Sequence, residues 1–147
     1  MLVENTVSFT LNLTANGVPL VNNGTFTSST STVMYSNPTP TTIAALDYYN
    51  LDGSGGDRIL SAADTIGIVG SFTVGAGVYT VLNSIFDFNE GSSQTIPAFT
   101  FHTLLIINSG IKHIPASTTV TCHSIDINDD ASVEINADGG GKLSVIK

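Results

Sequence analysis

The chain has 147 residues, of which only 11% are charged, and twelve Asp and Glu outweigh four Lys and Arg to give a net charge of −8. Ordinary soluble proteins are about 25% charged. A nucleic-acid surface needs clustered basic side chains, whereas the four here are scattered along the chain: Arg58, Lys112, Lys142 and Lys147. The acidic balance also opposes docking on anionic lipid. We therefore expect no nucleic acid and no membrane among the partners, and one domain, or one domain with an arm.

Cysteine content and the N-terminus restrict the class further. The single cysteine, Cys122, has no intramolecular partner, so the fold is not a disulfide scaffold. The start of the chain lacks a basic segment followed by a long apolar run, so we expect no signal peptide. Ser, Thr, Asn, Gly, Val and Ile dominate, which favours strands and turns. The composition predicts an all-β fold.

The first part of the chain reads as a β-rich attachment region over residues 1–49. Apolar and polar residues alternate from Val7 to Leu13, and the turn pair Asn16-Gly17 follows. An edge strand here could add to the sheet of a partner. The predicted attachment face consists of Val7, Phe9, Leu11 and Leu13.

A polar connector is expected over residues 50–65. Its run "NLDGSGGDR" places Asn50, Asp52 and Ser54 at positions 1, 3 and 5 of a loop that is similar to an EF-hand or dockerin calcium loop. Position 12 is Ser61 instead of an acid, although Asp64 could close the loop, and no flanking helix is evident. A solvated turn is the better interpretation, and we expect neither a metal nor another cofactor.

A repeat of about twenty residues marks the C-terminal part, residues 66–147. Three segments read apolar, any residue, apolar, Asn: they begin at Phe86, Leu105 and Ile125 and end at Asn89, Asn108 and Asn128, spaced by 19 and 20 residues. Isoleucines follow 7, 6 and 7 residues later, at Ile96, Ile114 and Ile135. This period predicts a short β-solenoid in which each coil is one rung, apolar residues point inward and the asparagines stack at corners. The alternative is a β-sandwich or jelly roll with evenly spaced strands.

Several polar residues are candidates for a catalytic or metal site. The three histidines, His102, His113 and His123, lack metal-binding spacing as a set. His102 and the pair Cys122-His123 are predicted to lie on adjacent rungs, where they either form a two- or three-ligand site or are ordinary residues of the wall.

Asp126 and Asp129-Asp130 are paired carboxylates of the kind a glycan-cleaving enzyme carries. The expected counterparts of Asp126 are Asp87 and Ile106, so the row is not consistently acidic. The glycine-rich stretches at 75–77 and 139–141 read as tight corners. We expect no enzyme.

The chain stops on the apolar stretch Val145-Ile146-Lys147 without a capping segment. An open rung end exposes unpaired backbone groups, so either identical chains cover each other here or the chain has been cut short. Of these two we expect the homo-oligomer, as a homotrimer about a threefold axis.

The repeat units and their Ile-Pro-Ala echoes resemble short β-solenoids of bacterial surface proteins and the fibre, spike and decoration proteins of tailed bacteriophages. The resemblance covers about residues 86–147. It implies a non-enzymatic virion protein, a trimeric head fibre or capsid decoration protein, located in the virion and bound to itself and to a capsid or other virion protein. The alternative is a glycan-binding adhesin or receptor-binding module. An adhesin would need exposed aromatic rings, and the chain has no tryptophan and only Tyr35, Tyr48, Tyr49 and Tyr79.

Overall fold

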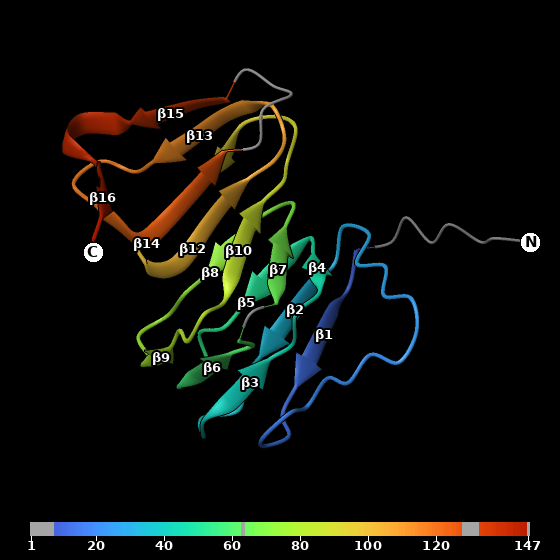
Figure 1. Ribbon diagram of the computed structural model, residues 1–147. Coiled ribbons are helices and arrows are strands. Elements are labelled where there is room, and N and C mark those ends of the chain that lie inside the picture. The colour runs from blue at the N-terminus through green and yellow to red at the C-terminus, as the bar shows by residue number, and fades with distance from the viewer. Residues whose placement is uncertain (1–7, 63, 128–132, 147) are drawn as a thin grey trace, which may run out of the picture.

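The computed structural model describes residues 8–62, 64–127 and 133–146 of the chain (Figure 1). These residues form β-strands and one 3-10 turn, η1 (Asp138–Gly140), and no α-helix occurs among them. The paired strands run parallel and build a β-solenoid of about six turns with rungs of roughly 21 residues. The predicted fold class is confirmed.

Each rung carries up to three short strands, and equivalent strands of successive rungs form three faces. Among the described residues, face I consists of two sheets that are not paired with each other. The first contains β1 (Thr10–Leu13), β2 (Thr32–Tyr35), β5 (Asn50–Asp52) and β8 (Phe72–Thr73), and the second contains β11 (Gln94–Thr95), β13 (Gly110–Ile114) and β15 (Val133–Ala137). Face II contains β3 (Thr41–Ile43), β6 (Arg58–Leu60), β9 (Tyr79–Thr80), the first parts of β12 (Thr100–Ile106) and β14 (Thr119–Ile127), and β16 (Lys142–Val145). Face III contains β4 (Asp47–Tyr48), β7 (Thr65–Ile68), β10 (Ile85–Phe88) and the second parts of β12 and β14.

The parallel stack begins at β1, well before the predicted start of the solenoid at residue 66. Thr10 pairs with Thr32, and Thr32 pairs with Asn50. Residues of the expected attachment region and connector therefore form rungs of the same stack. The sequence period is hidden there because paired residues lie 17 apart at Thr41 and Arg58 but 22 apart at Thr10 and Thr32.

Aromatic rings join the rungs in the interior. Phe86 contacts Phe72 at a ring-centroid distance of 5.0 Å and Phe101 at 5.2 Å, and Phe101 contacts Phe99 at 4.8 Å. These edge and tilted contacts contribute beyond the apolar area that they bury. Because each ring touches residues of neighbouring rungs, the core is one continuous column.

The repeat alignment predicted from the sequence is wrong by one residue in its second copy. Leu104, not Leu105, lies between Phe86 and Ile125, and Leu104 and Ile106 are the fully buried residues of this segment. Four consecutive apolar residues, 104–107, conceal the alternation, and a one-residue slip reverses the face of every side chain. In the third copy Ala137, not Ile135, pairs with Ile114, a two-residue displacement that keeps the inward side.

Candidate functional site

A row of outward positions on face III alternates acidic and non-acidic residues. From β4 to β14 it reads Asp47, Gly67, Asp87, Leu105 and Asp126. The expectation that Asp126 matches Ile106 is wrong, because Ile106 pairs with Ile127 and Leu105 pairs with Asp126. Successive strands lie about 4.8 Å apart, so the aspartates recur every second rung.

Asp87 is buried on this outward row. It is 4% exposed, and its Oδ1 atom has no hydrogen-bond partner. A Cβ on Gly67 would overlap Oδ1 of Asp47 and would lie 3.2 Å from Nδ2 of Asn89. The side chains of Asp47 and Asn89 thus lie over the glycine.

Burial makes the carboxyl of Asp87 a weaker acid than an exposed aspartate. Desolvation by burial, followed by repulsion from Asp47, raises the pKa of Asp87 from 3.8 to about 6, although the Asn89 side chain and Lys112 oppose the rise. The group therefore changes charge near neutral pH.

Two basic side chains are structural and lie inside the solenoid, with no exposed surface. Arg58 donates from Nη1 to the carbonyls of Asn37 (3.1 Å) and Asp57 (2.7 Å) and from Nη2 to that of Tyr35. Lys112 donates from Nζ to the carbonyl of Glu90 (2.6 Å) and to Oε1 of Gln94 (3.1 Å). Both stabilise corners by donating to backbone carbonyls at strand ends and in turns. The carbonyl of Asp57 also accepts a hydrogen bond from the backbone N–H of Thr41 at 3.2 Å.

Burial lowers the pKa of Lys112, and the nearby Glu90 and Asp87 oppose this effect. Sequence reasoning treated both cations only as scattered charges. Their burial could have been predicted from the alternation of the strands, because Arg58 and Lys112 lie two residues before Leu60 and Ile114, which point inward.

The weak metal candidates are spread along a strand instead of lining a loop. Asn50 and Asp52 belong to β5, and Oδ1 of Asn50 accepts hydrogen bonds from the backbone N–H and Oγ of Ser71 at 3.0 and 2.9 Å. Oδ1 of Asp52 accepts from the N–H of Ser54 at 2.8 Å. These oxygens make rung-to-rung and turn contacts. The expected solvated turn is therefore found only at Ser54, because Asn50 and Asp52 belong to a strand.

The predicted attachment residues divide between core and surface. Val7 lies outside the described residues, Phe9 is 54% exposed, and Leu11 and Leu13 pack against the core. β1 is the outermost strand of its four-stranded sheet. The segment that follows β1 in the sequence, residues 14–31, packs Leu20 and Phe26 against the core. The rings of Phe26 and Tyr48 have centroids 5.9 Å apart.

At the predicted asparagine corners, Asn108 donates from its side-chain amide to the backbone carbonyl of Asn89 on the preceding rung. Asn128, as well as Asp129 and Asp130, lies outside the described residues.

The prediction that His102 and His123 lie on adjacent rungs is confirmed. Their rings have centroids 5.4 Å apart, at the bend between the two parts of β12 and β14. Cys122 points inward and is fully buried, and burial raises the pKa of its thiol. His113 is separate and lies 3.5 Å from a carboxylate oxygen of Asp138.

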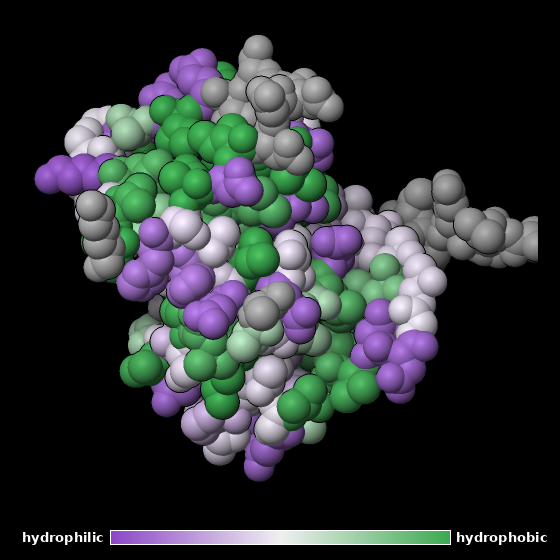
Figure 2. All heavy atoms as spheres, viewed as in Figure 1, coloured by the Kyte–Doolittle hydropathy of each residue, from purple (hydrophilic) through white to green (hydrophobic). Residues whose placement is uncertain are grey.

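Apolar side chains are exposed at the last rung. Ile127 is 47% and Val145 55% exposed, and Figure 2 shows apolar residues gathered in the area of β13, β14 and β15. Within the described ranges, the first part of β14 pairs with a following strand, β16, whereas the second part of β14 pairs with none.

No family model matches the chain, and neither a curated protein nor a solved structure matches it. In the part of the chain that the structure describes, no helix is long and apolar enough to span a bilayer. The geometry defines the class of the protein as a three-faced parallel β-solenoid.

Proposed function

We propose that the protein is a non-enzymatic structural component of a bacteriophage virion, a head fibre or capsid decoration protein that works as a homotrimer. The observation that carries this proposal is the stack of parallel rungs from β1 to β16 around one continuous core. Contacts in such a stack are made between neighbouring rungs, so the molecule is a stiff element whose length is set by the number of rungs.

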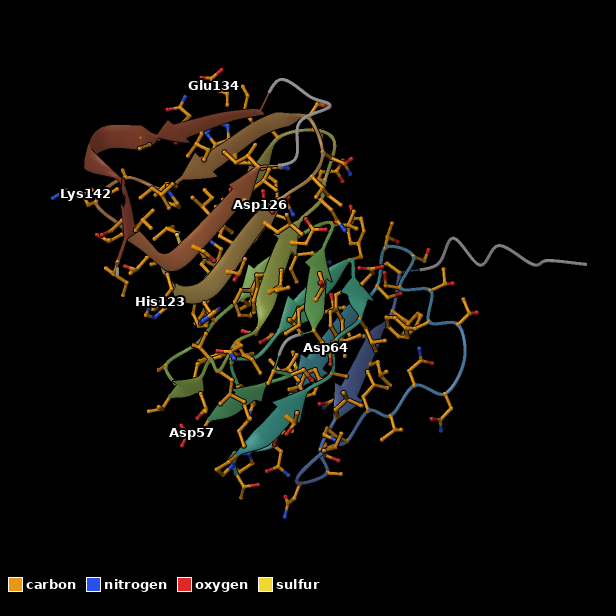
Figure 3. All side chains as sticks on the ribbon, viewed as in Figure 1. Asp57, Asp64, His123, Asp126, Glu134 and Lys142 are labelled. Carbon is orange, nitrogen blue, oxygen red and sulfur yellow. The ribbon has the colours of Figure 1, made fainter. Side chains whose placement is uncertain are left out.

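The distribution of charge supports the same function. Arg58 and Lys112 lie inside, so Lys142 is the exposed basic residue of the described chain. Asp57, Asp64, Asp126 and Glu134 lie on the outside (Figure 3). An acidic exterior keeps neighbouring copies soluble and apart, as a densely decorated particle requires.

The first rung is the proposed attachment end. The outer edge of β1 and the exposed ring of Phe9 would add to a sheet of a capsid or other virion protein. Backbone hydrogen bonds would provide affinity there, and Phe9 would provide specificity.

The glycan-binding alternative is the weaker candidate because the tyrosines serve the interior. Tyr35 and Tyr48 are fully buried, and their hydroxyls lie 3.0 Å apart. Tyr79 is half-buried and donates its hydroxyl to the carbonyl of Val74 at 2.6 Å. Tyr49 is thus the tyrosine left for stacking on a sugar.

The test combines two measurements on the tag-free protein. Light scattering should give about three chain masses, and the protein should co-sediment with phage particles that lack it. A Phe9→Ser variant should keep the mass and lose co-sedimentation. If the protein is a monomer that does not bind the particles but binds selected sugars on a glycan array, the adhesin replaces this proposal. If incubation with the protein shortens a polysaccharide, the protein is an enzyme.

A further inference from the structure

The bend shared by β12 and β14 places two imidazoles side by side on the outside of the solenoid. Thr103 pairs with Ser124 and Phe101 with Cys122, so His102 and His123 face each other across the rungs. His102 is half-buried and His123 is exposed, and Figure 3 shows His123 at this bend. The backbone fixes the spacing of the pair, and solvent can reach it.

We propose that His102 and His123 form a binding site for a borderline divalent transition-metal ion, of which Zn²⁺ is the representative. Imidazole nitrogen suits Zn²⁺, Ni²⁺ and Cu²⁺ and not the hard cations Mg²⁺ and Ca²⁺. With Zn–N bonds of about 2.1 Å and tetrahedral angles, two rings on one ion have centroids about 5 Å apart. The observed centroid distance is 5.4 Å. Small rotations about the side-chain bonds are enough to bring one nitrogen of each ring onto the ion.

A neighbouring hydroxyl pair orients one of the two rings. Nδ1 of His102 lies 3.2 Å from Oγ1 of Thr103, which in turn lies 2.9 Å from Oγ of Ser124. When Nδ1–H donates to Thr103 and Thr103 donates to Ser124, Nε2 of His102 keeps its lone pair for the ion. Metal-bound histidines generally use the second nitrogen in this way. Thr103 is therefore a positioning residue.

The protein supplies two ligands and leaves the remaining positions open. Among the described residues, no group of three or more His, Cys, Asp or Glu side chains lies close enough to share an ion. Cys122 follows the inward direction of its strand and is no ligand. Water, or a donor from another molecule, completes the coordination, and this open geometry is that of an exchangeable ion.

The test is calorimetric titration of the tag-free protein with Zn²⁺ in an excess of Mg²⁺, which occupies unspecific acidic sites. His102→Ala and His123→Ala should each weaken Zn²⁺ binding by more than about tenfold, since loss of an outer partner alone costs that much. His113→Ala removes a histidine paired with Asp138 and should leave the affinity unchanged. Circular dichroism checks that all three variants keep the fold.

Thr103 provides a second measurement. Thr103→Val should weaken binding by about tenfold or more, and Thr103→Ser, which keeps the hydroxyl, should restore it. Zn²⁺ binding that survives in both His102→Ala and His123→Ala, or that falls equally in His113→Ala, would overturn the proposal, as would the lack of any Zn²⁺ binding by the unaltered protein. Equal affinity of the valine and serine variants would remove the role given to Thr103.

Discussion

Asp87 is predicted to destabilise the folded protein at neutral pH, and Asp87→Asn should relieve this. The folded carboxyl has a pKa of about 6 against an ordinary 3.8. Each pKa unit corresponds to about 1.4 kcal/mol, so the ionised side chain costs about 3 kcal/mol. The side chain is 4% exposed, which leaves little solvent screening to reduce this figure.

The sign follows from proton binding. Between pH 3.8 and about 6 the folded state holds a proton that the unfolded chain has released, so the free energy of unfolding falls as pH rises. Below this window the carboxyl is neutral in both states and costs nothing. Asn is neutral at every pH. Asp87→Asn should therefore match the unaltered protein near pH 4 and exceed its stability by up to about 3 kcal/mol at pH 7.5.

Urea unfolding at a series of pH values measures this difference. Asp126→Asn is the matched control, because Asp126 occupies the same outward row but is exposed. The control should change stability by no more than about 0.5 kcal/mol. The reasoning is wrong if Asp87→Asn is no more stable than the unaltered protein at pH 7.5, or if its advantage does not vary between pH 4 and pH 7.

Four further substitutions, of which Gly91→Ala is a control, test the packing of the rungs by urea unfolding. Gly77→Ala places a Cβ onto the backbone carbonyl oxygen of Gly56 and should cost about 1–3 kcal/mol, whereas Gly91→Ala, with nothing within 4 Å, should cost less than about 1 kcal/mol; equal losses would contradict the close approach. Arg58→Met removes the side-chain donor from the carbonyls of Tyr35 and Asn37, whereas the carbonyl of Asp57 keeps the N–H of Thr41, and should cost about 3 kcal/mol; a neutral result would mean that water replaces the guanidinium. Phe101→Ala removes a ring from the column and should cost about 3–5 kcal/mol; a loss below 1 kcal/mol would place the ring outside the core.

The architecture could be predicted because one part of the chain repeats clearly. The period of about twenty residues in the segments that end at Asn89, Asn108 and Asn128 predicted the solenoid, although the register of the second segment is wrong by one residue. The earlier rungs could not be found in this way, since Thr41 and Arg58 pair across only 17 residues and carry none of the repeat's residues. A solenoid needs equal strand directions, not equal rung lengths, because corners absorb insertions.

Features that depend on register were the least accessible to sequence reasoning. Alternation predicts that Asp87 points outward, but it predicts neither the burial of Asp87 nor the approach of Asp47, two rungs away, to Gly67. Such a contact can be predicted only when the register of every strand pair is known to the residue. The uniformly apolar run 104–107 does not fix the register of its strand. The histidine pair was accessible because both residues precede their apolar segments at nearly the same distance.

The in-register parallel stack is the central claim, and paired cysteines test it most directly. In a Cys122→Ala background, cysteines at Thr103 and Ser124, and separately at Thr32 and Asn50, occupy facing positions of successive rungs. Facing positions lie about 4.8 Å apart, within the range of a disulfide, whereas Thr103 and Asp126, offset by two residues, lie about 8 Å apart, beyond it. Mass spectrometry after mild oxidation should show a disulfide in both facing pairs and free thiols in the offset pair. Free thiols in the facing pairs, together with a disulfide in the offset pair, would contradict the stack.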